Sequence, residues 1–401
     1  MSLRHTPVLL LLALAGCASP PAKPPDAHAA AACPQCPTCP PIEVKQPEKP
    51  LQGAEWSDLT GWPDEDPMPA FETFRASCAV LNGGNGGQSQ SLWHAVCESA
   101  RSANIASAGE ARAWFEAQFR PWALVNPDGN RTGLVTGYYE PLLNGSRTRK
   151  PPYLSPLFPP PDDLVTVDLA DVYPELKNMR LRGRLLGRKL VPYYSRSEWT
   201  GQEDSRSGSA LLWTDDPLDL FFMQIQGSGQ VALDDGTRIR VSYADQNGHP
   251  FRSIGRWLVE QGEMKLEQAS MQNIKAWARA HPQRVQELLN ANPSMVFFRE
   301  VPADGSGPPG ALGVPLTPER SIAVDPRVIT LGAPVFVATT WPNDTRPLNR
   351  LMLAQDTGGA IRGPVRADFF WGSGADAGSL AGRMRQRGSM WVLMPGSYSP
   401  K

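Results

Sequence analysis

The hydrophobic positions of this chain follow mostly the two-residue period of β-strands. From residue 134 onward, short apolar or alternating runs stand between turns rich in glycine, proline, asparagine and aspartate. These runs predict strands over 134–140, 219–226, 230–233, 238–243, 321–324, 335–339, 351–355 and 390–393. Asp235-Gly236 is the two-residue turn expected of a hairpin between the third and fourth of them. The pattern therefore predicts mainly β structure.

A few short segments follow the helical period instead. Helices are predicted over 91–103, 110–119, 253–260 and 271–280. Strands and helices alternate without a βαβ rhythm, which argues against a doubly wound sheet.

The first residues have the form of a bacterial lipoprotein signal peptide, which we place at 1–16. A basic start precedes an apolar run over 8–14 that is too short to span a bilayer. The run ends in a lipoprotein-like cleavage box, so the mature chain is expected to begin at a lipidated Cys17. Because Ala18 follows the cysteine, we expect an outer membrane lipoprotein that faces the periplasm. An ordinary secreted signal peptide is the alternative.

Residues 17–52 are predicted to form a tether between the lipid anchor and a folded region. The segment is rich in proline and alanine and has no apolar periodicity, so it cannot bury enough surface to offset its ordering entropy. Extended as polyproline II at about 3.1 Å per residue, it would reach on the order of 100 Å.

Five cysteines follow Cys17, three of them within the tether. Cys33, Cys36 and Cys39 have C-x-x-C spacing, but interleaved prolines and the absence of a nearby histidine other than His28 favour disulfides, or no role, over zinc. Cys78 and Cys97 lie in the first folded segment, where an oxidising periplasm permits a disulfide.

Composition narrows the classes of partner. Lys+Arg 39 against Asp+Glu 40 leaves almost no net charge, which argues against a nucleic-acid footprint and against a strong electrostatic hold on anionic lipid. The folded region contains no sequence cluster of histidine, cysteine and carboxylate ligands, so no metal or organic cofactor is expected. The 401 residues, less signal and tether, leave room for two modest domains.

The segment LMLAQDTGGAIRGPVRADFFWGSG, residues 351–374, holds the strongest chemical signal. It sets two carboxyls, Asp356 and Asp368, at strand ends among glycines and aromatics. Burial among aromatic neighbours would raise the pKa of Asp368 and keep it protonated, as a general acid requires. Arg366 shares its face by the period of two, and a close Arg366 would lower that pKa. Alternatively, both aspartates are turn caps that accept backbone N–H bonds.

Seven other residues are candidates for contacting a sugar. They are Tyr138, Glu140, Gln224, Gln226, Ser228, Gly358 and Trp371. Gln224 and Gln226 share one face if their segment is a strand, and both can bond hydroxyl and N-acetyl groups. Glu140 competes as a second catalytic carboxylate, although its proline neighbour fits a domain junction equally well. Trp371 offers a flat surface for a pyranose ring, unless it is core.

Six segments in order along the chain resemble the membrane-bound lytic murein transglycosylase A family, whose members carry a C-terminal 3D domain. They are GYYEPLL (137–143), PYYSR (192–196), the block 219–255, NPSMVFFRE (292–300), PLTPERSIAVDP (315–326) and AQDTGGAIRGPVRADFFWG (354–372). The three aspartates that give the 3D domain its name match Asp325, Asp356 and Asp368. An ordered series of long motifs is far more specific than any one of them.

The resemblance implies a fold as well as an activity. It implies a discontinuous double-psi β-barrel catalytic domain over 53–140 and 300–401, with a second β-barrel domain inserted at 141–299, a few short helices, and a cleft for a glycan strand between the two.

The implied reaction is cleavage of the β-1,4 bond between N-acetylmuramic acid and N-acetylglucosamine of peptidoglycan, with formation of 1,6-anhydromuramic ends. Asp368 matches the family's single catalytic acid, and Asp356 would support it. The expected partners are peptidoglycan strands, the outer membrane through the lipid anchor, and complexes of cell-wall synthesis or division.

Three other functions fit parts of the sequence. A hydrolytic glycosidase would pair Asp368 with Asp356 or Glu140 and release reducing ends. An aspartic protease is suggested by Asp356-Thr357-Gly358, but the chain has only one such triplet. A non-catalytic peptidoglycan-binding lipoprotein is the alternative from a different class.

Overall fold

The computed structural model describes residues 49–81, 87–176, 179, 181–303 and 307–399. The predicted signal peptide, Cys17 and the tether cysteines Cys33, Cys36 and Cys39 lie outside these ranges. No described helix has the length and apolar character needed to cross a membrane.

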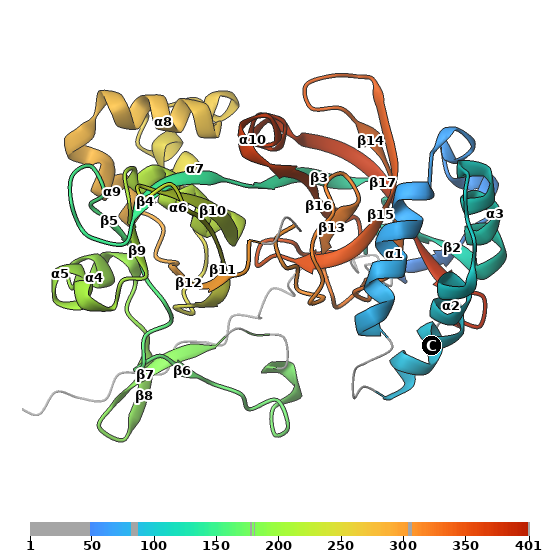
Figure 1. The fold of residues 1–401 in the computed structure, drawn as a ribbon, viewed down its shortest axis with the longest axis horizontal. Coiled ribbons are helices and arrows are strands. Elements are labelled where there is room, and N and C mark those ends of the chain that lie inside the picture. Colours follow the sequence, from blue (N-terminus) through green and yellow to red (C-terminus); the bar gives the residue numbers. More distant parts are fainter. Residues whose placement is uncertain (1–48, 82–86, 177–178, 180, 304–306, 400–401) are drawn as a thin grey trace, which may run out of the picture. The chain divides into compact units, whose positions relative to one another are not determined.

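Six strands close into a barrel in the order β17-β14-β15-β13-β16-β3. Their bounds are β3 Gly133–Glu140, β13 Ser321–Val324, β14 Pro334–Thr340, β15 Pro347–Thr357, β16 Arg366–Ser373 and β17 Arg385–Pro395. The ring closes because β3 pairs in parallel with β16 on one side and antiparallel with β17 on the other. In Figure 1 the C-terminal strands are orange and red, and the green β3 lies among them. A strand from the N-terminal half of the chain therefore closes a barrel whose other strands come from the C-terminal part.

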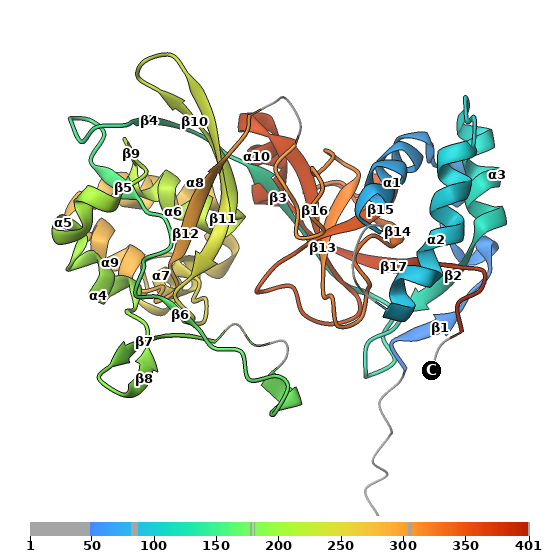
Figure 2. The ribbon, with the colours of Figure 1, turned by 60° about the horizontal axis from the view of Figure 1, so that its bottom comes forward.

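Two short strands and three helices add to the barrel's core. β1 (Leu51–Gly53) and β2 (Phe119–Leu124) extend the sheet beyond β17. The helices are α1 (Met68–Leu81), α2 (Gly87–Ser102) and α3 (Ala108–Gln118), which Figures 1 and 2 show side by side. Their buried aromatic side chains join the barrel core: Phe71, Phe74, Trp93, Trp114 and Phe115. The helices predicted over 91–103 and 110–119 are confirmed, with slightly earlier starts.

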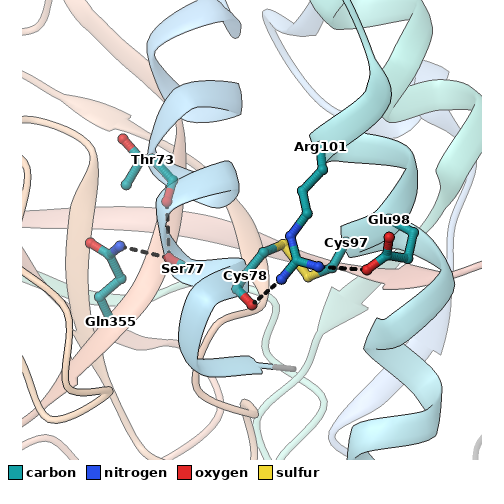
Figure 3. The surroundings of a disulfide bond; sticks show 7 residues. All are labelled: Thr73, Ser77, Cys78, Cys97, Glu98, Arg101 and Gln355. Carbon is teal, nitrogen blue, oxygen red and sulfur yellow. Dashed lines mark hydrogen bonds and ion pairs between the residues drawn. A yellow bond between two sulfur atoms is a disulfide. The ribbon is translucent and has the colours of Figure 1, made fainter. Parts of the chain in front are cut away.

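A disulfide joins the first two helices. Cys78 of α1 and Cys97 of α2, 19 residues apart in the sequence, are bonded and fully buried (Figure 3). The bond restricts the unfolded chain and so favours the folded pairing of these helices.

A second sheet of six strands forms a half-barrel in the order β12-β11-β10-β4-β9-β5. Its strands are β4 Leu142–Ser146, β5 Ser155–Leu157, β9 Leu212–Thr214, β10 Ser228–Leu233, β11 Arg238–Gln246 and β12 Val296–Val301. β10 and β11 form the predicted hairpin, but its loop has three residues, 234–236, instead of two, because Leu233 bonds with Thr237 and Gly236 alone takes a positive φ, of 87°. Figure 2 shows β10, β11 and β12 side by side.

Smaller elements complete the described chain. A three-stranded sheet contains β6 Val165–Thr166, β7 Arg182–Leu186 and β8 Lys189–Pro192. The other α-helices are α4 Arg196–Thr200, α5 Glu203–Arg206, α6 Pro217–Gln226, α7 Ile254–Glu260, α8 Met271–Ala280, α9 Val285–Asn290 and α10 Gly374–Arg383. Short 3-10 turns lie at Trp56–Asp58, Trp62–Asp64, Pro174–Leu176, Ser207–Ser209, Leu266–Gln268 and Pro282–Arg284.

The strand predicted over 219–226 is wrong, because this segment is the helix α6. Asp216 caps it by accepting from the amides of Leu218 and Asp219, and Pro217 occupies its first turn. Gly227 ends it in the left-handed region at a φ of 81°. A short apolar run does not distinguish strand from helix by period alone, whereas the Asp-Pro start and the glycine stop do.

The mainly β prediction is confirmed, and the strands of the C-terminal segment lie where the apolar pattern puts them. The double-psi description of the barrel stays a prediction.

Candidate active site

Four residues stand in one row across neighbouring strands of the barrel. Asp356 of β15 and Asp368 of β16 both pair with Ala323 of β13, and Asp368 also pairs with Thr136 of β3. Register partners point to the same face of a sheet, so both carboxyls project from one side of the barrel wall. With strands about 4.8 Å apart, the two aspartate Cα atoms lie roughly 10 Å from each other. Ala323 occupies the register position between them.

Asp368 is a partly exposed acid with one side-chain hydrogen-bond donor beside it. The hydroxyl of Thr136 donates to Oδ1 of Asp368 at 2.6 Å, and Nη2 of Arg366 donates to that hydroxyl oxygen at 2.9 Å. Burial raises the pKa of Asp368, while the Thr136 bond and the charge of Arg366 lower it, and burial is the largest of the three. Of the two effects that the sequence left open, desolvation therefore outweighs Arg366.

Asp356 lies in a more richly bonded position. The Tyr138 hydroxyl donates to its Oδ2 at 3.1 Å, and the backbone amide of Ala311 donates to its Oδ1 at 3.0 Å. Burial raises the pKa of Asp356 to about 6 against these donors, and the charge of Asp368 adds to the rise. Both acids of the row thus hold a proton more tightly than an exposed aspartate does.

An apolar cluster packs around this row of acids. Tyr138, Leu316, Ala323, Ile361 and Phe370 are buried together, and the rings of Tyr138 and Phe370 have centroids 5.1 Å apart. The alternation along β16 explains the arrangement, because Phe370 shares the face of the acid at 368 while the residues on either side face the main core. This apolar surround is the physical source of the raised pKa values.

Asp325, the remaining aspartate of the 3D motif, has a different environment. It is fully buried, accepts two bonds from the Arg327 guanidinium at 2.9 and 2.6 Å, and accepts the amide of Gly363 at 2.8 Å. The Arg327 bonds, helped by the backbone amides, lower the pKa of Asp325 to about 2 despite its burial. Asp325 is therefore an ionised residue that fixes its loop, and no proton transfer is available from it near neutral pH.

The row of acids has properties that proton donation requires. Asp368 combines a raised pKa, partial exposure and a neutral donor that stabilises the anion left after proton transfer. Among the residues that the structure describes, no group of three or more histidine, cysteine or carboxylate side chains is placed to hold a metal ion.

Comparisons with known proteins match most of the described chain. The MltA specific insert domain matches residues 134–299, and the 3D domain matches residues 320–394. Membrane-bound lytic murein transglycosylase A of Escherichia coli K12 is 31% identical over 314 residues, which cover 77% of this chain and 76% of the relative. This chain belongs to the membrane-bound lytic murein transglycosylase A family.

Solved structures of the family agree with this membership. MltA from Neisseria gonorrhoeae, in its monoclinic form, is 39% identical with a TM-score of 0.74 and covers 88% of this chain and 94% of its own. The structure of E. coli MltA with bound chitohexaose is 28% identical with a TM-score of 0.62 and covers 88% and 93%.

Glu140, a predicted sugar contact and rival catalytic acid, is a structural residue. Its side chain is fully buried and accepts from Arg240 Nε at 2.6 Å, from Gln230 at 2.8 Å and from Ser373 at 2.6 Å. These residues come from the half-barrel sheet and from the end of β16. Glu140 therefore ties the two sheets at the point where β3 ends, and it has no free surface for a ligand.

The predicted glutamine pair does not form a sugar-binding face. Because α6 is a helix, Gln224 and Gln226 point in different directions. Gln224 is buried and accepts from Arg196 Nη2 at 2.6 Å, whereas Gln226 accepts the backbone amide of Tyr139 at 3.0 Å. Ser228 is buried at the start of β10.

Trp371 is a core residue, which corrects the predicted stacking role. Only 5% of it is exposed, and its ring packs on Phe369 and Trp341 with centroids 4.6 and 5.3 Å away. The period of two places it on the face opposite Asp368. Gly358, by contrast, directly follows β15 and is partly exposed two residues from Asp356.

Thr136 is the site residue that sequence reasoning missed. Its segment GLVTGYYE offered a signal, because a strand over 134–140 puts Thr136 on the face of Tyr138. Its partner Asp368 is 232 residues away in the sequence, so the pairing of β3 with β16 had to be known first.

Proposed function

We propose that this chain cleaves glycan strands of peptidoglycan as a lytic transglycosylase, with Asp368 as its acid. The observation that carries the assignment is the position of Asp368 on the barrel wall. It is partly exposed, burial raises its pKa, and the hydroxyl of Thr136 donates to it. The E. coli relative named as a lytic murein transglycosylase and the family structure with bound chitohexaose support a glycan substrate.

The reaction needs one carboxyl that first gives and then takes back a proton. Protonated Asp368 donates to the oxygen of the β-1,4 bond, and the bond from that oxygen to C1 of N-acetylmuramic acid breaks. The N-acetylglucosamine leaves with a free 4-hydroxyl, and positive charge develops at C1. The Asp368 carboxylate then removes the proton of the C6 hydroxyl of the same muramic residue. O6 bonds to C1, which closes the 1,6-anhydro ring without consuming water.

The neighbours of Asp368 match the two halves of this cycle. The Thr136 hydroxyl stabilises the carboxylate that exists between the two proton transfers, and Arg366 polarises that hydroxyl. Asp356, held by Tyr138 and the Ala311 amide, adds negative potential on the same face, where an oxocarbenium-like C1 would be stabilised once the acid is ionised.

The domain boundaries and the attachment to the membrane are part of the proposal. We keep the predicted division into a catalytic domain, 53–140 and 300–401, and an insert, 141–299, but move two boundaries to strand ends, because β1 begins at Leu51 and β12 of the half-barrel sheet ends at Val301. Relatives named membrane-bound support membrane association. The lipoprotein box ending at Cys17 supports attachment to the outer membrane through acyl chains, with the Pro/Ala-rich tether presenting the enzyme to the wall.

The decisive experiment is product analysis with Asp368→Asn. Wild type should clear purified sacculi and release muropeptides with 1,6-anhydro ends, which mass spectrometry separates from hydrolysed ends by the mass of one water. Asp368→Asn should bind sacculi normally while turnover falls by on the order of 100-fold or more, the usual contribution of a general acid. Asp376→Asn, an exposed aspartate on α10, is the matched control and should keep full activity.

Each alternative function predicts a different result. Reducing ends from wild type would show a hydrolase. Clearing by Asp368→Asn equal to that of wild type would remove Asp368 from the mechanism, and absence of clearing by every variant, wild type included, would favour a binding protein.

A further inference from the structure

The strand that carries Asp356 contains one extra residue directly before it. Ile322 of β13 pairs with Ala354, but the next residue, Ala323, pairs with Asp356, so Gln355 has no register partner. In a regular strand Ala354 and Asp356 would point to the same face. Here Ala354 belongs to the main core while Asp356 meets Tyr138 on the other face. The irregularity therefore brings the acid to the site, as bulges near active sites commonly do.

The side chain of Gln355 is fully buried and bonded on both ends. Its Nε2 donates to the hydroxyl of Ser77 on α1 at 2.8 Å, and its Oε1 accepts from the hydroxyl of Ser321 on β13. The Ser77 hydroxyl in turn donates to the backbone carbonyl of Thr73 at 2.9 Å. Figure 3 shows Ser77 turned toward Gln355, while the next residue, Cys78, is turned toward α2 and its disulfide.

The backbone of Gln355 also holds the loop that contacts Asp356. The amide of Leu312 donates to the carbonyl of Gln355 at 2.9 Å, and the preceding amide, that of Ala311, donates to Asp356. Gly310 lies so close that a Cβ there would stand 2.5 Å from the Gln355 carbonyl oxygen. One residue thus fixes both the strand irregularity and the loop donor.

The polar character of Gln355 needs an explanation beyond packing. A buried carboxamide must give up water at both ends, and an apolar side chain of equal size would fill the position without that cost. A fully bonded buried polar group does, however, specify one arrangement of its neighbours. Three elements meet at this side chain: α1, β13 and β15.

We propose that Gln355 is a positioning residue for Asp356, which it holds on the site face by fixing the extra residue of β15 between Ser77 and Ser321. This inference rests on the proposed function, since it assigns a role within the same site. Gln355 touches neither substrate nor reacting atoms and acts through the placement of the neighbouring carboxyl.

Gln355→Met tests the proposal, because methionine has nearly the same shape and no hydrogen-bonding amide. The expected result is a fall in kcat on glycan strands on the order of 100-fold, as misplacement of a catalytic group by about 1 Å causes. KM should change by less than about threefold, because no sugar contact is lost. Ser77→Ala, which removes one of the two partners, should give a smaller loss of the same kind.

Thr339→Val is the control for a merely structural effect. It removes another buried hydroxyl, which donates to the carbonyl of Arg387 at 2.8 Å between β14 and β17. Its Tm should fall about as far as that of Gln355→Met while kcat stays within twofold of wild type.

A double-mutant cycle with Asp356→Asn separates the outcomes. If Gln355 acts through Asp356, adding Gln355→Met to Asp356→Asn should cause no further loss of kcat. A kcat of Gln355→Met within twofold of wild type, or full additivity in the cycle, would overturn the proposal. Full activity of Asp356→Asn would also overturn it while leaving the Asp368 assignment intact, and activity of Asp368→Asn would end the proposed function instead.

Discussion

Two carboxylates stand on the same pair of strands, and their environments differ: Glu140 is fully buried and Asp368 is partly exposed. Asp368 and Glu140 lie on the β3–β16 ladder, where Asp368 pairs with Thr136 and Glu140 pairs with Ser373. Glu140 accepts from the guanidinium of Arg240 and from two neutral donors. Asp368 accepts from the hydroxyl of Thr136, and it is this hydroxyl, not Asp368, that the guanidinium of Arg366 bonds. The difference teaches that the partners of a carboxylate and its exposure, and not its place on the ladder, decide whether it has a structural role or is left open to a ligand.

The first test removes the charge of Glu140, the carboxylate that is bonded to a guanidinium. Glu140→Gln keeps the shape but leaves the Arg240 guanidinium, 5% exposed, without its anion. Loss of one partner of a buried ion pair costs about 3–5 kcal/mol, so the free energy of unfolding should fall by that amount. Urea unfolding followed by circular dichroism measures it.

The matched control is the same kind of change at the other end of the ladder. Asp368→Asn removes an acid whose ionised form burial disfavours, so its stability near pH 7 should stay within about 1 kcal/mol of wild type, or rise. Equal losses from the two variants would contradict the comparison.

Removal of the Asp325 carboxylate should cost less stability than removal of the Glu140 carboxylate and more than removal of the Asp368 carboxylate, since its partner Arg327 is 48% exposed. Its pKa is lowered to about 2, against about 3.9 in an unfolded chain, so its stabilisation is present above pH 4 and is lost as the pH falls through 2. Asp325→Asn should therefore cost at most about 2 kcal/mol at pH 7.

The pH dependence distinguishes this effect from lost packing. Unfolding measured from pH 7 to pH 2 should show the difference between Asp325→Asn and wild type shrinking below pH 4. A constant difference across that range would mean that the charge of Asp325 contributes nothing.

The smallest expected effect comes from removing the hydrogen bond that Thr136 donates to Asp368. Thr136→Val removes the hydroxyl that stabilises the Asp368 carboxylate, so the pKa of this acid should rise further. The acid then stays protonated to higher pH, and the alkaline limb of kcat/KM should move up by about one pH unit or less.

A pH–rate profile of Thr136→Val against wild type makes the measurement. Movement of the alkaline limb to lower pH would mean that Arg366 had taken the place of Thr136 beside Asp368. The roles proposed for Thr136 and Arg366 would then be wrong.

Local chemistry made much of the fold predictable. Asp235-Gly236 marks the hairpin correctly, because the last position of its loop has a positive φ that favours glycine, although the loop contains three residues instead of the predicted two. The Asp-Pro start and the glycine end of α6 are local signals that indicate a helix. The strand prediction for this segment was wrong because it rested on the apolar run alone.

The candidate site was predictable in part. The pair Asp356 and Asp368 stands out in the sequence, but Glu140, Gln224 and Trp371 look equally fit to bind sugar until their partners are known. Arg240 lies 100 residues from Glu140 and Arg196 lies 28 residues from Gln224. Contacts between residues so far apart in the sequence cannot be predicted from the hydrophobic periodicity of one chain.

The sequence by itself determined the strand-rich composition, the turns, the family motifs and the two candidate acids, because each depends on neighbours within a few residues. Only the tertiary structure decided which carboxyl is neutralised by a cation and which is left to titrate. It also decided that one extra residue, Gln355, turns Asp356 to the face of Asp368. The reason is physical: desolvation and hydrogen bonding depend on what surrounds an atom in space, and chain closure brings those groups together from distant positions.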